Sequence, residues 1–452
     1  MKSTILQCGK FFPVICILTV LLFTSEAYSQ KTFTKRIIGG GSLIATVQTN
    51  SGKYVSVSEI SLGTFIVRKT DSKGKRLWER SFEFDLNNTL EAVNIGGIAQ
   101  TTDGGYVLVG SGLFIDLVPA GLAYGIIIKL KPNGHLEWAK RLSKNSGSDL
   151  RLAFTSVSAA PDGGFAVTGI DCIGGTTLCD GAGTILLTFN SSGTVLSAKS
   201  FGNRTQGNSA IVSASGGGFL LTFSSAHSDT SFAGTSLIRV SDAGKVLWGE
   251  FYKNFFFRAV STPDDGVILA GGCFRHSCGN DLFLLKLKSN GQSEWQARFT
   301  SDRDIRFISD VIQTSDGGYF VTGSASGGDE IFFLKIDSSG KLVFGTTFGE
   351  NGSENITWGN KIFTSTDGGF LLFASTGQQY SLTPFDALIL KLNSDGLVSG
   401  CSLSGSLNVS TRHSGNLKIG APKFSGSSFS VEEAGLQVNS SSSKKKVSTA
   451  CP

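Results

Sequence analysis

The chain has 452 residues, among them 58 glycines, 34 phenylalanines and a single methionine, and its formal net charge is +5. A composition so rich in glycine and aromatic residues predicts an all-β fold with many tight turns. Basic residues are scattered apart from Lys444-Lys445-Lys446, which argues against nucleic-acid binding because that function needs a concentrated basic patch.

The first segment has the pattern of a secretory signal peptide. Lys2 and Lys10 form a basic start, residues 11–23 are apolar, and Ala27-Tyr28-Ser29 offers a small-x-small cleavage site. The apolar run is far shorter than the ~20 residues of a membrane helix, and no later segment fits better, so we expect no membrane span. We therefore expect a signal peptide at residues 1–29 and a secreted or periplasmic mature protein.

Behind this segment, one unit of roughly fifty residues recurs seven times, a period typical of solenoids and propellers. Its clearest marker is a tight turn followed by an apolar strand, as in DGGYFVTG from Asp316. A second marker is an apolar strand that ends in a turn with glycine at the fourth place, as in IFFLKIDSSG. The first marker begins at Ser51, Asp103, Asp162, Gly216, Asp264, Asp316 and Asp367, and the turn glycines of the second are Gly74, Gly134, Gly193, Gly244, Gly291, Gly340 and Gly396.

Each unit predicts four short antiparallel strands, named a to d in chain order. Strand a precedes the DGG turn, b follows it, c is the apolar strand of the second marker, and d usually carries an aromatic residue four places after the turn glycine. Asp-Gly-Gly and D-x-x-G supply the positive φ that tight hairpins require. The c strands are apolar on both faces, as expected for a sheet between two neighbouring sheets. Seven such units predict a seven-bladed β-propeller.

The succession DGGY-x-V-x-G, then L-I-K-L-D-x-x-G, then W resembles the repeats of β-propeller proteins secreted by bacteria and, more distantly, the kelch family. The resemblance covers roughly residues 31–400. It implies the fold and says almost nothing about activity. The adjacent arginine and paired glycines of kelch blades are missing here, apart from Gly271-Gly272.

The mature chain starts with the end of a unit. Residues 33–37 (FTKRI) align with Trp138–Leu142 (WAKRL), a d strand, whereas the seventh unit has Gly400 and Ser404 where its own d strand should be aromatic. We therefore expect the N-terminal strand to complete the last blade, which closes the ring and removes an open sheet edge. The propeller then spans residues 30–400, and a Ser/Gly-rich extension follows at 401–452.

An even number of cysteines follows the signal peptide, which in an exported chain indicates disulfides. Their spacing predicts two short loop clips, Cys172–Cys179 and Cys273–Cys278, and one long tie, Cys401–Cys451. Neither short pair has the CxxC or CxxH partner that a zinc site would need, so we predict no metal site.

Candidate binding residues lie in the b–c and d–a connections, because binding usually resides in variable loops on a rigid scaffold. Asp171 begins the loop of the third unit, Arg275 and His276 lie in the clipped loop of the fifth, and His227 lies in the equivalent loop of the fourth. The alternative for the clipped loop is a plain staple against fraying. Trp358 stands outside the repeat positions and could stack on a sugar or pack between blades.

A basic residue recurs five places before most of the turn glycines, with two interpretations. One is a ring of positive charge for an anionic ligand. The other is an ion pair with the aspartate of the DGG turn in the same blade, which predicts the pairs Lys129–Asp103, Lys286–Asp264, Lys335–Asp316 and Lys391–Asp367. Lys69 and Arg239 lack that aspartate and should have solvent or other partners.

Two hypotheses for function follow. The first is a binding scaffold for a protein, peptide or glycan; the second is a secreted enzyme of the quinoprotein dehydrogenase, glycan lyase or hydrolase type, since propellers host all of these. No nucleophile elbow, HExxH, phosphate loop or dinucleotide-binding turn is present, so we predict no catalytic residue and no cofactor. We expect a monomer.

Overall fold

The computed structural model describes residues 31–61, 63–84, 91–114, 123–144, 150–173, 183–201, 205–225, 234–273, 281–303, 305–325, 330–349, 361–376, 385–401, 404–412, 419–420, 426–428, 431–435, 438–442 and 447–448. These residues form an all-β structure without helices. Among them there is also no helix with the length and hydropathy to cross a membrane.

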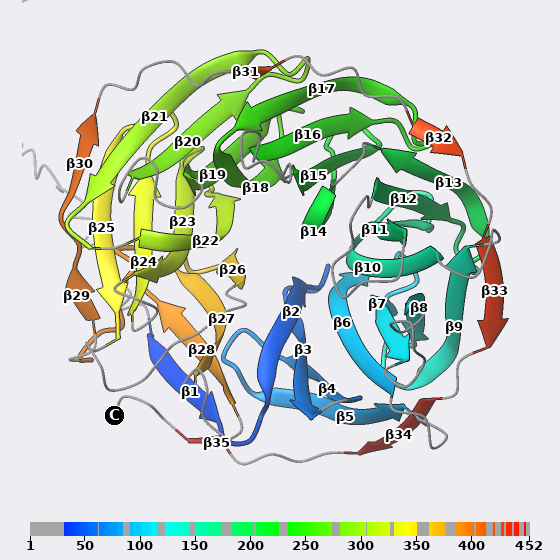
Figure 1. Ribbon diagram of the computed structural model, residues 1–452. Helices are drawn as coiled ribbons and strands as arrows, with labels where there is room; N and C mark the ends of the chain where they lie inside the picture. Colours follow the sequence, from blue (N-terminus) through cyan, green and yellow to red (C-terminus); the bar gives the residue numbers. More distant parts are fainter. Residues whose placement is uncertain are drawn as a thin grey trace, which may run out of the picture.

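Seven antiparallel sheets stand around a common centre, which confirms the predicted seven-bladed β-propeller (Figure 1). The innermost strands, a, are β2 (Ser42–Gln48), β6 (Glu91–Gln100), β10 (Leu150–Ala159), β14 (Thr205–Ser213), β18 (Phe255–Ser261), β22 (Ile305–Gln313) and β26 (Lys361–Thr364). The b strands are β3 (Tyr54–Ser61), β7 (Tyr106–Phe114), β11 (Phe165–Ile173), β15 (Phe219–Ser225), β19 (Val267–Cys273), β23 (Tyr319–Ala325) and β27 (Phe370–Thr376).

The outer half of each blade consists of strands c and d. The c strands are β4 (Thr64–Thr70), β8 (Ala123–Leu130), β12 (Gly183–Phe189), β16 (Gly234–Val240), β20 (Asp281–Leu287), β24 (Glu330–Ile336) and β28 (Asp386–Leu392). The d strands of blades one to six are β5 (Arg76–Phe84), β9 (Leu136–Lys144), β13 (Val195–Phe201), β17 (Val246–Lys253), β21 (Ser293–Ser301) and β25 (Leu342–Phe348).

The N-terminal strand closes the ring, as predicted. β1 (Phe33–Ile37) pairs antiparallel with β28, with Phe33 opposite Lys391 and Ile37 opposite Ala387, and so serves as the d strand of blade seven. This pairing covers the edge that β28 would otherwise expose.

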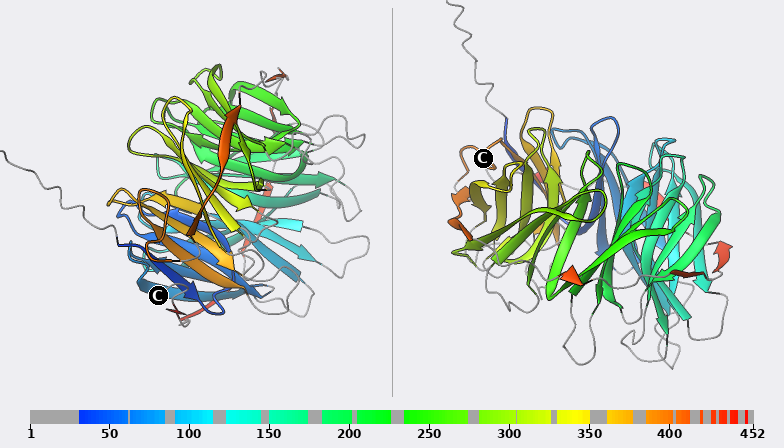
Figure 2. Two further views of the ribbon diagram at one scale, coloured as in Figure 1. Left: turned by 90° about the vertical axis from the view of Figure 1, so that its left-hand side faces the viewer. Right: turned by 90° about the horizontal axis from the view of Figure 1, so that it is seen from above.

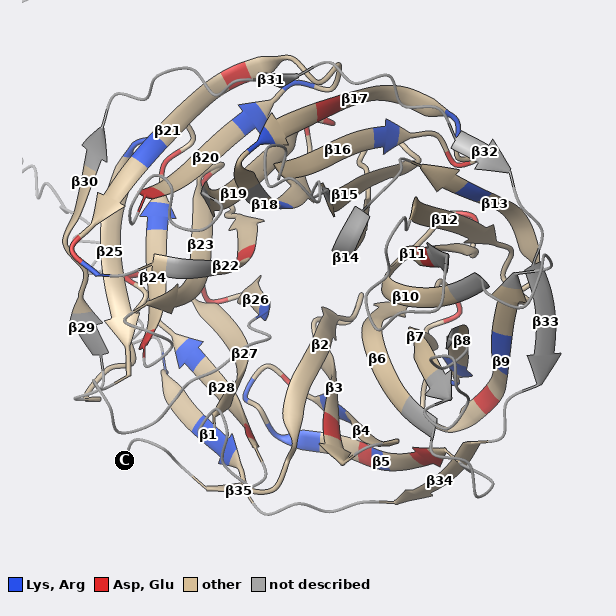
Figure 3. Cartoon of the chain, in the orientation of Figure 1, with Lys and Arg blue, Asp and Glu red and all other residues tan. Residues whose placement is uncertain are grey.

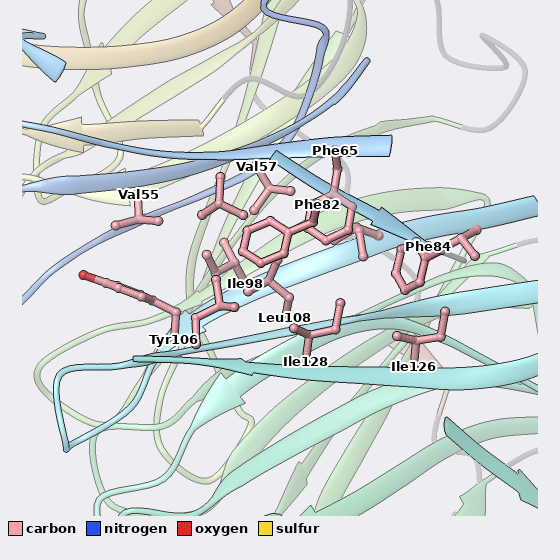
Figure 4. Packing of buried hydrophobic residues seen from close by; sticks show 14 of the residues in the cluster. Val55, Val57, Phe65, Phe82, Phe84, Ile98, Tyr106, Leu108, Ile126 and Ile128 are labelled. Atoms are coloured by element: carbon pink, nitrogen blue, oxygen red, sulfur yellow. The ribbon is translucent and has the colours of Figure 1, made fainter. Parts of the chain in front are cut away.

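The core lies between blades. Every residue of strands β12, β16, β20, β24 and β28 is buried, which agrees with their apolar sequence on both faces. Figure 4 shows one such interface, where Val57 and Phe82 of blade one face Leu108 and Ile128 of blade two. Because each blade buries both faces against its neighbours, no single blade could bury its apolar surface alone.

The two sequence markers of the repeat meet across blades. The indole of Trp138 in blade two lies against the turn glycine Gly193 of blade three, where a Cβ would come within 2.4 Å of the ring, and Gly193 has a φ of +76°. Only glycine satisfies both conditions without strain. Phe33 of β1 takes the tryptophan position for blade seven and lies against Gly74 of blade one.

The C-terminal extension forms a fifth strand on every blade. We call these seven strands the belt: β29 (Ser404–Ser406), β30 (Val409–Arg412), β31 (Ile419–Gly420), β32 (Gly426–Ser428), β33 (Val431–Gly435), β34 (Val438–Ser442) and β35 (Val447–Ser448). They pair in turn with the d strands of blades six, five, four, three, two, one and seven, so the belt runs once around the outer wall (Figures 1 and 2). The sequence did not predict this arrangement.

The predicted disulfides rest largely on cysteines outside the described residues. Cys401 is buried and disulfide-bonded. Its predicted partner Cys451, together with Cys179 and Cys278, lies outside the described part, as do the side chains of Cys172 and Cys273. The three pairings therefore stay predictions.

Candidate functional site

The two ends of the propeller are built differently. At one end, which we call the turn face, every a–b connection has five residues, as between Gln48 and Tyr54 or between Gln313 and Tyr319. The turns repeat the same pair of backbone hydrogen bonds; Thr101 N donates to Gly105 O, and Gly104 N donates to Thr101 O. Uniform, internally bonded turns leave little room for a specific site.

The opposite end, which we call the loop face, carries the b–c and d–a connections. The b–c connections range from two residues, between Ser61 and Thr64, to nine, between Ile173 and Gly183. Variation in length on a rigid scaffold is the usual mark of a binding surface.

The predicted ion pairs of the turn face are confirmed in all four blades. The ammonium nitrogen of each lysine lies 2.7–2.8 Å from a carboxylate oxygen, in Lys129–Asp103, Lys286–Asp264, Lys335–Asp316 and Lys391–Asp367. The lysine stems are buried along the sheet while the carboxylates stay at the rim. Hydrogen bonds from Lys335 and Thr314 lower the pKa of Asp316 to about 2.

The two exceptions also have the expected other partners. Lys69 donates to the hydroxyl of Tyr106 in the next blade at 2.7 Å, and Arg239 lies 3.2 Å from Asp265 in the next blade. The ring of basic residues is therefore part of the architecture, since its charges are compensated or bonded within the described residues.

A second group of ion pairs fixes the loop-face ends of the c strands. Arg298 Nε donates to Asp281 at 2.7 Å, and Arg36 Nε lies 2.7 Å from Asp386 at the equivalent position of blade seven. In blade six, Arg303 lies 3.6 Å from Glu330. These carboxylates are buried, so their partners keep the ends of the strands in place beneath the loops.

Asp171 is the predicted site residue whose side chain the structure describes. It is buried at the end of β11, where Oδ1 accepts a hydrogen bond from Gly183 N at 2.7 Å and Oδ2 one from Ser200 Oγ at 3.2 Å. Both contacts lie within blade three. The other candidates, His227, Arg275, His276 and Trp358, lie outside the described residues, so a binding role for all five stays a prediction.

Three charged residues that the sequence analysis did not single out occupy one position of the repeat on the inner strands. Arg258, Asp310 and Lys361 each stand six residues before the turn aspartate, in blades five, six and seven. Blades one to four have Ala45, Gly97, Ser156 and Ala210 there, and in Figure 3 strands β2 and β10 are tan along most of their described length. This change from small to charged residues was the available sequence signal.

We call these three residues the inner arc. Asp310 is buried, accepts from the Lys361 ammonium at 2.8 Å and from Ile362 N at 3.1 Å, and so joins blades six and seven. Arg258 is exposed near the middle of β18. β18 is the innermost strand of its blade, so the backbone of Arg258 lies on the inner side of the ring. No described carboxylate forms an ion pair with it.

Metal binding has no support in the part of the chain that the structure describes, where no group of three or more His, Cys, Asp or Glu side chains is placed to hold an ion. The carboxylates described above have cationic or backbone partners instead.

Solved structures resemble this chain in fold, with low TM-scores and low sequence identity. No family model and no curated protein matches the chain, so the kelch resemblance stays a prediction. Polysaccharide lyase Uly1 is 10% identical, over 79% of this chain and 90% of that chain, with a TM-score of 0.40. A protein of unknown function from Dyadobacter fermentans is 10% identical, over 80% of this chain and 99% of that chain, with a TM-score of 0.42. Penicillium chrysogenum α-L-arabinanase, complexed with arabinobiose, is 10% identical, over 71% of this chain and 98% of that chain, with a TM-score of 0.41. Similarity this low carries no argument about ligand or activity.

Proposed function

We propose that this is an exported binding protein that recognises a protein, peptide or glycan carrying negative charge through its loop face. The observation that carries the proposal is the difference between the two ends of the ring. Seven a–b turns and six c–d turns, each of five residues, close the turn face, whereas the loop face has connections of different lengths over buried, ion-paired strand ends. A rigid support with variable connections is suited to binding.

Arg258, near the middle of the innermost strand β18, gives the expected charge to a ligand that extends from the loop face into the ring. An exposed guanidinium without a described carboxylate partner can donate a bidentate pair of hydrogen bonds to a carboxylate or sulfate. Lys361, whose side chain is 41% exposed, stands at the same repeat position two blades away, although Asp310 compensates part of its charge. The inner side of the ring is thus more favourable for anionic than for cationic groups.

The test is an array of glycans and peptides, each in an acidic and a neutral form, probed with the purified chain. The best acidic binder is then titrated against Arg258→Gln and against Lys131→Gln, which removes the same charge from the turn face. We expect Arg258→Gln to weaken binding at least about tenfold, because charge-assisted hydrogen bonds contribute ~1.5–3 kcal/mol, and Lys131→Gln to change it little. Equal effects of the two variants, or preference for neutral probes, would reject the proposal.

The same incubations test the enzyme hypothesis. A glycan that is shortened, or that acquires new reducing or unsaturated ends, would establish lyase or hydrolase activity in place of binding alone.

A further inference from the structure

One inter-blade interface differs from the other six. Tyr54 of blade one packs on Phe363 and Phe373 of blade seven, with ring centroids 5.2 and 5.3 Å apart, and marks the face of blade one that meets blade seven. We call this interface the seam, because it joins the first blade of the chain to the last. Ser56, Arg68 and Glu79 lie on the same face, since β3, β4 and β5 pair Ser56 with Arg68 and Arg68 with Glu79.

At one position of strands c and d, the seam has charged residues where the other interfaces have uncharged ones. The residues equivalent to Arg68, six places before each turn glycine, are Ile128, Leu187, Ile238, Leu285, Leu334 and Leu390. Those equivalent to Glu79 are Ala139, Ala198, Gly249, Gln296 and Gly345. Blade one therefore has a buried ion pair at a position where the other blades have an aliphatic residue next to a residue without charge.

This ion pair leaves buried polar atoms without partners, although Arg76 Nη1 also lies 3.9 Å from Glu79 Oε2. Arg68 Nε lies 2.5 Å from Glu79 Oε2, and both side chains are almost fully buried. However, Arg68 Nη2, Glu79 Oε1 and the neighbouring Thr70 Oγ1 have no hydrogen-bond partner in the described structure. Burial lowers the pKa of Arg68 in spite of its contact with Glu79. Buried polar groups without partners cost stability, so the seam gains less from closure than an aliphatic interface gains.

Backbone amides of blade one donate hydrogen bonds across the seam and can report on its opening. Leu43 N donates to Ser375 Oγ at 2.6 Å and Gly41 N donates to Phe385 O at 2.9 Å, both from blade one to blade seven. On the outer wall, the belt crosses the seam in its last step, from β34 on blade one to β35 on blade seven. There Ile37 and Arg36 of β1 pair with Val447 and Ser448.

We propose that the ring is built to open at this seam, and that the end of the belt is the strap that holds it closed. The polar interface makes the seam the weakest of the seven junctions. β35 pairs with β1, which belongs to blade seven, while β34 pairs with β5 of blade one, so these two consecutive belt strands lie on opposite sides of the junction. Release of β35 removes this restraint and leaves the other belt strands paired.

Hydrogen exchange of the full chain, followed by mass spectrometry, tests the strap. The reporters are the amides of Gly41 and Leu43, whose hydrogen bonds cross the seam, and the comparison amides are Ile211 and Ile362, which donate to Ser156 and Asp310 across two other interfaces. Val447→Pro breaks β35 through an exposed residue, and Ser410→Pro breaks the belt strand β30 on blade five in the same way.

We expect Val447→Pro to accelerate exchange of the seam amides at least about tenfold and to leave the comparison amides unchanged. Ser410→Pro should not accelerate the seam amides. Equal acceleration by both variants, or faster exchange at another interface in the unchanged protein, overturns the proposal.

A second pair of variants tests the polar seam without altering the belt. Arg68→Leu with Glu79→Ala gives blade one the residues found in the other blades, and should slow exchange of the seam amides severalfold. Glu79→Ala alone leaves the guanidinium buried without its partner and should accelerate exchange at the seam. If the double variant exchanges at the seam as fast as the unchanged protein, the ion pair is not what weakens this junction.

Discussion

The position of a residue within the repeat, and the number of blades that share it, indicate its role in this protein. A lysine near the end of strand c meets an aspartate in the a–b turn because the hairpins put both at the same rim. Thr101 and Thr314 add hydrogen bonds to Asp103 and Asp316. A charge that recurs once per blade therefore indicates architecture, whereas a charge confined to a few blades, such as Arg258, is the better guide to function.

The Lys335–Asp316 pair makes a small contribution to stability that depends on pH. The pKa of Asp316 falls from 3.8 to about 2, so its contribution is complete above about pH 4 and is lost as the pH falls through 2. Because Asp316 is 62% exposed, solvent screening limits the contribution to ~0–1 kcal/mol. We expect Lys335→Met to lower the free energy of unfolding at pH 6 by about this amount and to show a much smaller difference from the unchanged protein near pH 2.

Urea unfolding at pH 6, 4 and 2.5 measures this effect. Lys131→Met, an exposed lysine of the same face, is the control and should leave the stability nearly unchanged at every pH. A Lys335→Met effect that stays constant down to pH 2.5 would show that the loss comes from packing of the lysine stem.

The sequence predicted contacts within a repeat better than contacts between repeats. Lysine and aspartate of one blade are linked by a fixed strand register, so their meeting could be inferred from spacing alone. Trp138 and Gly193 belong to different units, and nothing in the spacing says which neighbour a tryptophan meets. In the sequence, Arg68 and Glu79 stand out only because the equivalent positions of the other repeats have aliphatic or uncharged residues.

At the scale of elements, β1 determines whether the ring closes. Thr34, the second residue of β1, is buried and pairs with Leu390. Thr34→Pro replaces a buried residue and removes a backbone donor from a strand that pairs with β28 along its whole length. We expect this variant to lose at least about 2 kcal/mol of unfolding free energy in urea titrations.

Lys31→Pro is the matched control, since Lys31 is exposed and precedes β1. It should lose no more than about 0.5 kcal/mol, as surface substitutions usually do. If Thr34→Pro is as stable as this control, β1 is not needed to complete blade seven.

The belt escaped sequence prediction for a physical reason. Its strands are as short as two residues, as in β31 and β35, and they pair through the backbone on the outer edge of each blade. Such strands need no alternation of apolar and polar side chains, which is the main sequence signal of a β-strand. Serine and glycine therefore read as an irregular tail, although each short strand covers an otherwise open edge.

At the scale of the whole molecule, the fold was predictable and the site only in part. Seven regular units dictate the blade number and the position of the loop face. The inner arc depends instead on three particular substitutions at one repeat position, and its significance emerges only once β18, β22 and β26 are known to be innermost. Regular features define the scaffold, and departures from them mark both the candidate site and the seam.

The belt also bears on the predicted Cys401–Cys451 bond. Ser399 N, two residues before Cys401, donates to Thr32 Oγ1 at 2.9 Å, next to the start of β1. β35 is antiparallel to β1 and runs from the level of Ile37 toward the start of β1. A bond between the two cysteines would close the belt covalently around all seven blades, with roughly fifty residues in the loop, so full opening of the ring at the seam would also require reduction of this bond.

A loop of this length predicts a large stabilisation, about 4 kcal/mol by the loop-entropy estimate and less if the native geometry is strained. We expect Cys451→Ser to lower the free energy of unfolding by about 2–4 kcal/mol and to speed unfolding in urea, measured without reductant. In the unchanged protein, reductant should reproduce the effect, and in Cys451→Ser it should add little at the belt. Mass mapping of the non-reduced chain checks the pairing directly. A peptide that joins Cys401 to any cysteine other than Cys451 would show that the belt is not closed into a hoop. A loss of stability in Cys451→Ser would then have a cause other than this disulfide.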